Sequence, residues 1–139
     1  MENISRNIDC YSFRTPLGVC AGIAPFNFPA MIPLWMFPLA ITCGNTFVLK
    51  PSERVPGAME HMCKLLKEIN LPKGVLNVVQ GGFDTTSHIV HHKDIKSVSF
   101  VGGNRAGEYI YKVCGETGKR AQVNMGAKNH CVIMPDSDK

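Results

Sequence analysis

The chain has 139 residues, of which 45% are hydrophobic, so it is long enough to form one domain around a buried core. Its 15 lysines and arginines against 11 acidic residues give a net charge of +4, but they are scattered without a run or an aromatic rhythm, which argues against nucleic-acid binding. The 6 cysteines form no Cys-x-x-Cys pair, a pattern typical of reduced thiols in an intracellular protein and not of a disulfide framework.

No targeting segment is recognisable in the sequence, because its first residues lack both a secretion-type apolar core and an arginine-rich presequence pattern. Residues 23–42 are apolar enough to suggest a membrane span. Prolines interrupt this stretch repeatedly, so we interpret it as a helix buried inside a soluble domain and expect no membrane contact. The prolines are Pro25, Pro29, Pro33 and Pro38.

The predicted elements alternate between strand and helix along most of the chain. Residues 4–14 partly alternate in polarity and predict an exposed strand that pairs outside the domain. The further strands are predicted at 19–24, 46–50, 75–79, 98–101, 120–123 and 131–134, and the helices at 29–43, 56–70, 85–92 and 104–115. This alternation indicates an α/β fold, a Rossmann-like parallel sheet with helices on both faces.

Helix ends are indicated by prolines, glycines and capping side chains. Pro29 is tolerable at the first position of its helix, and Gly44 follows the end of the same helix. Asp84 and Asn104 are predicted to cap the starts of the third and fourth helices.

Polar residues follow the strands at the ends where a parallel sheet binds ligands. Right-handed crossovers place the carboxyl ends of all parallel strands at one edge, and ligands bind along that edge. The polar positions there are 26–27, 50–54, 102–103 and 124.

Residues 98–107 predict a buried strand that runs into a glycine turn and then a helix. Gly102 and Gly103 allow dihedral angles that a side chain forbids and let the backbone approach a ligand closely. The helix start that follows would suit an anionic diphosphate. Because the spacing from Gly102 to Gly107 is not the usual dinucleotide fingerprint, a glycine turn without a ligand is the alternative interpretation.

The stretch from Lys50 to Arg54 places two cations, a hydroxyl and a carboxylate directly after a strand. Glu53 can accept hydrogen bonds from two ribose hydroxyls while Lys50 donates to them. The alternative is a solvated turn. Asn27, between apolar residues, is expected to be partly buried, and its amide either stabilises an oxyanion or satisfies loop backbone groups.

Neither a metal site nor a nucleophile is predicted. His88, His91 and His92 have near-helical spacing without a carboxylate or cysteine at matching offsets, so we interpret them as a solvated helix face and predict no metal. The sequence shows no setting of cations or a helix start that argues for a nucleophile at any of the cysteines.

Four motifs together resemble the aldehyde dehydrogenase superfamily, and within it the CoA-acylating methylmalonate-semialdehyde dehydrogenase branch. They are Pro25-Phe-Asn-Phe-Pro29, Lys50-Pro-Ser-Glu53, Phe100-Val-Gly-Gly103 and Asn124-Met-Gly-Ala-Lys128. The resemblance implies that residues 15–139 are part of the NAD-binding domain and that residues 1–14 are an arm used in subunit association. It also implies that the catalytic domain and the nucleophilic cysteine lie beyond this sequence.

The resemblance further assigns roles to individual residues. Those expected to bind the cofactor are Ala24, Phe26, Lys50, Glu53, Arg54, Gly102 and Gly103. Gly103 departs from the usual serine, which leaves the backbone N–H as donor. Asn27 is the expected oxyanion donor, and Asn124 stands where hydrolytic relatives carry a general base. Because asparagine cannot be that base, Asn124 supports the acylating branch.

The implied function is NAD-dependent oxidation of a semialdehyde to an acyl-CoA in valine and pyrimidine catabolism, with CoA as co-substrate. The implied setting is the mitochondrial matrix, and the full-length enzyme is expected to be a homotetramer. This chain is expected to be a fragment that is inactive alone. A non-catalytic nucleotide-binding or subunit-association module is the alternative.

Overall fold

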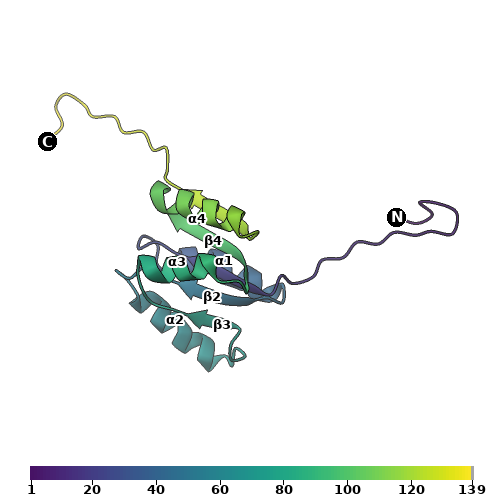
Figure 1. The fold of residues 1–139 in the computed structure, drawn as a ribbon. Coiled ribbons are helices and arrows are strands. Elements are labelled where there is room, and N and C mark those ends of the chain that lie inside the picture. Colours follow the sequence, from purple (N-terminus) through teal and green to yellow (C-terminus); the bar gives the residue numbers. More distant parts are fainter. Residues whose placement is uncertain (139) are drawn as a thin grey trace.

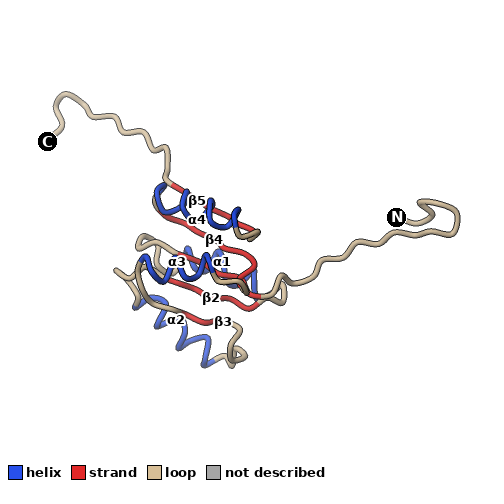
Figure 2. Tube along the Cα trace, viewed as in Figure 1, coloured by secondary structure: helices blue, strands red, loops and turns tan. Residues whose placement is uncertain are grey.

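A computed structural model describes residues 1–138, which contain one five-stranded parallel sheet. The strands lie in the order β3-β2-β1-β4-β5 (Figure 2). Their bounds are β1 (Val19–Ile23), β2 (Thr46–Lys50), β3 (Leu76–Val78), β4 (Ile95–Gly102) and β5 (Arg120–Met125). Ile23, the last residue of the central strand, pairs with Lys50, the last residue of β2, and with Phe100, after which β4 continues to Gly102.

Four helices within the described residues cover the two faces of this sheet, as the sequence predicts (Figure 1). They are α1 (Met31–Thr42), α2 (Gly57–Glu68), α3 (Phe83–His91) and α4 (Asn104–Glu116). Buried residues of α1 and α2 pack with Phe47 and Leu49 on one face. Buried residues of α3 and α4 pack with Val98 and Phe100 on the other. The α/β prediction is therefore confirmed.

The strand order places a topological switch point in the middle of the sheet. From β1 the chain moves outward through β2 to β3, then returns to pair β4 with the other side of β1. The two loops that follow β1 and β4 therefore leave the sheet edge in opposite directions and open a crevice between them. Ligands of open parallel sheets bind in such a crevice, outside the carboxyl ends of the strands.

The helix ends follow only part of the sequence prediction. Gly44 follows α1 with φ of +83°, a conformation in which glycine is favoured over other residues, and this prediction is confirmed. Helix α1 begins at Met31 and not at Pro29, because Phe28 has φ of +58° and turns the chain. None of the described helices is both long and apolar enough to cross a bilayer.

The two predicted caps are wrong. Helix α3 begins at Phe83 with Gly82 at the cap position, so Asp84 lies within the first turn. Helix α4 begins at Asn104, with Gly103 as its cap. Neither helix has a side-chain cap hydrogen bond.

The two terminal segments form no strand of the sheet, so the strand predicted at 131–134 is wrong, while the pairing of residues 4–14 outside the domain stays a prediction. Residues 4–14 form no strand within the described chain, apart from an isolated bridge between Ser5 and Ile8, and they leave the body as an extended arm (Figure 1). The Met1 ammonium donates to the Cys10 carbonyl at 2.8 Å, which folds the tip back on itself. Residues 131–134 are exposed loop. Both stretches have strand-like composition, but a strand forms only where a neighbour accepts its hydrogen bonds, and neither stretch has one among the described residues.

Candidate functional site

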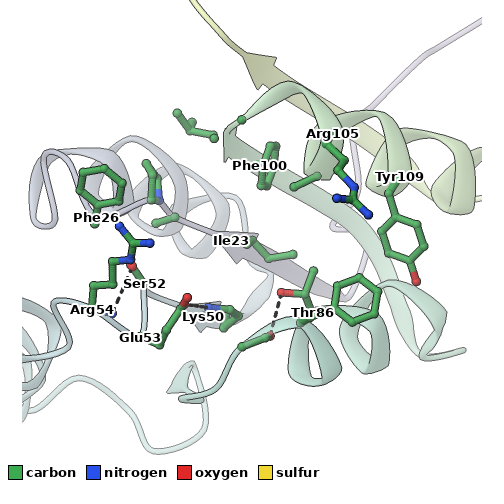
Figure 3. Close-up of a pocket in the computed structure, with 18 of the residues that line it drawn as sticks. Ile23, Phe26, Lys50, Ser52, Glu53, Arg54, Thr86, Phe100, Arg105 and Tyr109 are labelled. Atoms are coloured by element: carbon green, nitrogen blue, oxygen red, sulfur yellow. Dashed lines mark hydrogen bonds and ion pairs between the residues drawn. The ribbon is translucent and has the colours of Figure 1, made fainter.

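A cavity of about 830 Å³ lies at the carboxyl edge of the sheet, above the switch point (Figure 3). Its walls are the loops after β1 and β2, the turn after β4 and the first turns of α3 and α4. All seven residues that the sequence assigned to cofactor binding line this one cavity: Ala24, Phe26, Lys50, Glu53, Arg54, Gly102 and Gly103. Sequence motifs up to 80 residues apart thus meet in space because the parallel strands end at one edge.

Lys50 and Glu53 form an ion pair at the floor of the cavity (Figure 3). Lys50 is the last residue of β2, and it is only 4% exposed. Its ammonium donates to the Pro51 carbonyl at 2.8 Å and to Glu53 Oε2 at 3.3 Å, so the buried charge is compensated. Glu53 is more open, with 58% of its side chain exposed, and its carboxylate keeps room for further donors.

Glu53 is held in its charged form. A hydrogen bond from its own backbone, followed by the hydrogen bond from Lys50, lowers the pKa of Glu53 below its ordinary value of 4.5. Burial acts in the opposite direction and is outweighed. At neutral pH the cavity therefore presents a carboxylate that accepts hydrogen bonds, as recognition of ribose hydroxyls requires.

Phe26 and Arg54 close one rim of the cavity (Figure 3). The Arg54 guanidinium lies 5.3 Å from the centroid of the Phe26 ring, a cation–π contact that joins the loop after β1 to the loop after β2. The Arg54 backbone N–H donates to Ser52 Oγ at 3.3 Å, and Ser52 is buried. These contacts fix the turn that carries Glu53.

The glycine turn after β4 is needed for space and not for unusual dihedral angles, which corrects the sequence interpretation. Gly103 has φ of −74°, an ordinary extended backbone. A Cβ on Gly102 would lie 2.5 Å from the ring of Phe100, whereas a Cβ on Gly103 would meet nothing within 4 Å. Gly102 therefore accommodates the Phe100 ring, while Gly103 leaves the helix start open to a ligand.

Asn27 and Asn124 lie outside the large cavity. Asn27 is exposed and lines neither of the two described cavities, so the expectation of a partly buried amide is wrong. Its neighbours Phe26 and Phe28 are themselves more than half exposed, and so they do not enclose it. Asn124 lines a second cavity of about 50 Å³ on the α1 side of the sheet, together with Trp35.

The sequence reasoning missed the far wall of the large cavity, which two helices build. Phe83, Thr86 and Tyr109 line it, and the Phe83 and Tyr109 rings are 5.5 Å apart. The Tyr109 hydroxyl is 3.1 Å from Ser87 Oγ, which ties α4 to α3. The signal available in the sequence was aromatic residues in the first two turns of the helices after the third and fourth strands. Arg105, which lines the large cavity, and Trp35, which lines the second cavity, also lie on helices outside the recognised motifs and were missed.

No cysteine of the described residues lines either cavity. Burial raises the pKa of the Cys63 thiol, with help from Glu60, and burial also raises the pKa of Cys114. Both shifts oppose thiolate formation. Within residues 1–138, no group of three His, Cys, Asp or Glu side chains is placed to hold a metal ion.

The open parallel sheet, with a cavity outside the carboxyl ends of its strands at the switch point, defines the class of an α/β protein that binds ligands at this edge. The family model described as "Aldehyde dehydrogenase family" matches residues 1–139. The chain belongs to the aldehyde dehydrogenase family.

Three similar proteins are named as methylmalonate-semialdehyde dehydrogenases. The mitochondrial acylating methylmalonate-semialdehyde/malonate-semialdehyde dehydrogenase of Mus musculus is 60% identical over the whole chain. A crystal structure described as methylmalonate-semialdehyde dehydrogenase from Sinorhizobium meliloti 1021, complexed with NAD, is 51% identical, with a TM-score of 0.91 over 99% of the chain. The enzyme from Oceanimonas doudoroffii is 54% identical, with a TM-score of 0.81 over 88% of the chain. The chain spans 26%, 28% and 25% of these proteins, respectively.

Proposed function

We propose that this chain is the NAD-binding part of a CoA-acylating methylmalonate-semialdehyde or malonate-semialdehyde dehydrogenase. The observation that carries the proposal is the convergence of all seven predicted cofactor-binding residues on one cavity. The relatives named above support it, because a similar chain was crystallised with NAD and others are named as acylating enzymes.

The residues of the cavity fit a dinucleotide. Glu53 and Lys50 offer an acceptor and a donor to the adenosine ribose, and they are held 3.3 Å apart. The free N–H groups at the start of α4, next to Gly103, suit the diphosphate. Phe83 and Tyr109 form an apolar wall for the adenine. Ala24, Phe26 and Arg54 complete the rim.

The chemistry needs more than this cavity. NAD, when bound, supplies the acceptor for the hydride that leaves the semialdehyde. We assign Asn27 as an oxyanion donor, since its exposed amide N–H groups are free to face a substrate from outside the sheet edge. Asn124 cannot take a proton from water, so a thioester in its vicinity persists until a CoA thiol accepts the acyl group.

We further propose that residues 15–139 belong to the cofactor domain and that residues 1–14 are an arm for association with other subunits. The exposed apolar side chains Tyr11 and Phe13 support a contact role for the arm. The full-length protein is then a homotetramer of the mitochondrial matrix that acts in valine and pyrimidine catabolism. The mitochondrial names of the relatives support this location.

By itself the 139-residue chain should bind NAD without oxidising an aldehyde, because none of its described cysteines lines a cavity. A non-catalytic nucleotide-binding or association module is the second candidate. It is favoured by one observation, that 19 of the described residues line the large cavity and no cysteine is among them.

Calorimetric titration of the folded chain with NAD, beside an assay of NADH formation with malonate semialdehyde and CoA, tests these proposals. We expect saturable binding and no turnover. Absence of NAD binding by a chain that is folded by circular dichroism would refute the cofactor assignment. Steady NADH formation would refute the predicted inactivity and leave the enzyme assignment in place.

A further inference from the structure

The charges around the large cavity are unbalanced. Among the described residues that line it, Lys50, Arg54 and Arg105 are cationic, and Glu53 is the one carboxylate. Lys50 is paired with Glu53, and Arg54 lies on the Phe26 ring. Among residues 1–138, Arg105 has neither an ion-pair partner nor an aromatic ring beneath it, and the sequence motifs did not single it out. A cation-lined cleft raises the local concentration of an anionic ligand.

Arg105 occupies an unfavourable position for a structural arginine. It is the second residue of α4, where the positive end of the helix dipole disfavours a cation, and the first turn contains no acidic residue to offset it. The ion pairs of residues 1–138 are Lys50–Glu53 and Lys112–Glu116, so neither compensates Arg105. Within the described residues, no ion pair therefore offsets the cost of a cation at this helix start.

The Arg105 side chain points into the large cavity. Figure 3 shows Arg105 leaving the first turn of α4 and reaching over the cavity towards α3, beside Tyr109. Arg105, the glycine turn and Tyr109 line the same cavity, so a ligand that fills the cavity meets all three. A guanidinium matches phosphate oxygens with paired N–H donors.

We propose that Arg105 is a ligand-binding residue that recognises the diphosphate of the dinucleotide, and that it sets the preference of this cavity for nucleotides over nucleosides. The inference rests on the proposed NAD-binding function and adds to it a specific residue and ligand group. Two negative charges on the diphosphate match the cationic excess of the cavity. The attraction between Arg105 and this anion offsets the unfavourable electrostatic free energy of a cation at the helix start.

Titrating the 139-residue chain with adenosine, ADP and NAD tests the inference. We expect Arg105→Gln to weaken ADP and NAD binding by about tenfold and to leave adenosine binding unchanged, because only the phosphate contact is lost. Arg105→Lys should recover part of the affinity. The matched control is Arg120→Gln, since Arg120 is exposed, begins β5 at the opposite end of that strand and lines neither cavity.

Salt dependence and stability separate recognition from a merely structural role. Raising the salt concentration should weaken ADP binding less in Arg105→Gln than in the wild type or the Arg120→Gln control, since one screened contact is missing. The unfolding midpoint of the unliganded Arg105→Gln variant should not fall, because a cation leaves the positive helix end.

The outcomes are distinct. Wild-type-like ADP affinity in Arg105→Gln, or an equal loss of adenosine binding, would overturn the role of Arg105 while the proposed function stands. Failure of the folded wild type to bind both ADP and NAD would overturn the proposed function and this inference with it. Selective loss of ADP and NAD binding with a flatter salt dependence supports both.

Discussion

The two faces of the sheet are covered to different extents. On one face, α3 and α4 bury a continuous core that reaches from β1 to β5, with Ala121 and Val123 of β5 packed against it. On the other, α1 packs on β1 and β2, while Gln122 and Asn124 of β5 are exposed. Trp35 and Leu39 of α1 are 54% and 70% exposed beside this uncovered area.

The residues predicted to bind the cofactor and Asn124, which we assign to the reaction, lie in different cavities. The covered face supports the large cavity, whose walls come entirely from the described residues and hold every predicted cofactor-binding group. The open face carries Asn124 and only a small cavity. The proposed cofactor site thus lies where the core is well packed, and Asn124, which we assign to the reaction, lies where the sheet is uncovered.

The largest expected effect is on the covered face. Ile110→Ala should lower the free energy of unfolding by about 2–5 kcal/mol, because Ile110 is fully buried in the α3/α4 core and its loss leaves a cavity. Urea denaturation followed by circular dichroism measures the change. A cost below about 1 kcal/mol would mean that this core is no better packed than the open face.

Close packing between α4 and β5 gives the next test. A Cβ on Gly107 would collide with Met125 and lie 2.9 Å from Val123 Cγ1, so Gly107→Ala should cost about 1–3 kcal/mol. Gly115 is the control in the same helix, since a Cβ there meets nothing within 4 Å. Gly115→Ala should stabilise the chain by about 0.5–1 kcal/mol in the same urea titration. Equal effects at the two positions would contradict the described packing.

Glu53→Gln separates ligand binding from core packing. The variant should bind NAD about tenfold more weakly, because an amide is a poorer acceptor for ribose hydroxyls than a charged carboxylate. Calorimetric titration measures the affinity. The control is Glu116→Gln, whose carboxylate pairs with Lys112 on the exposed side of α4 and lines neither cavity. Similar losses in both variants would show that charge alone, and not the position of Glu53, governs binding.

The pKa of Glu53 predicts the pH dependence. The pKa of Glu53 in the folded chain lies below 4.5. The contribution of the charged carboxylate to stability and to ligand binding is therefore fully present above pH 4.5. It is lost as the pH falls through the pKa of Glu53 in the folded chain. NAD affinity should therefore be insensitive to Glu53 titration from neutral pH down to about 5 and should weaken only in more acidic solution. Titrations of wild type and Glu53→Gln at matched pH check this. An additional wild-type loss near pH 6 would contradict it.

The smallest effect is expected on the open face. Leu39→Gln should change the free energy of unfolding by no more than about 0.5 kcal/mol, since Leu39 is mostly solvent-exposed. The same urea titration used for Ile110→Ala measures it. A cost approaching that of Ile110→Ala would show that this face is covered in solution.

Sequence reasoning succeeded where local patterns determine position. The apolar runs that end at Pro51 or at Gly102 predicted the parallel strands, and the parallel arrangement then placed Lys50, Glu53 and the glycine turn at one edge. It could not place Phe83 and Tyr109 opposite each other, because that depends on how two helices pack. Residues 131–134 were mispredicted because composition reports strand propensity and not the presence of a partner strand.

The strand order also has a consequence for how the molecule assembles in time. Val19 pairs with Ile95, so the central contact of the sheet joins segments that are far apart in the chain, and the loop-closure entropy must be overcome before they meet. During synthesis, β1, β2 and β3 can pair before β4 has been made. The large cavity exists only once β4 has docked beside β1, so any ligand that binds there stabilises this long-range pairing by mass action.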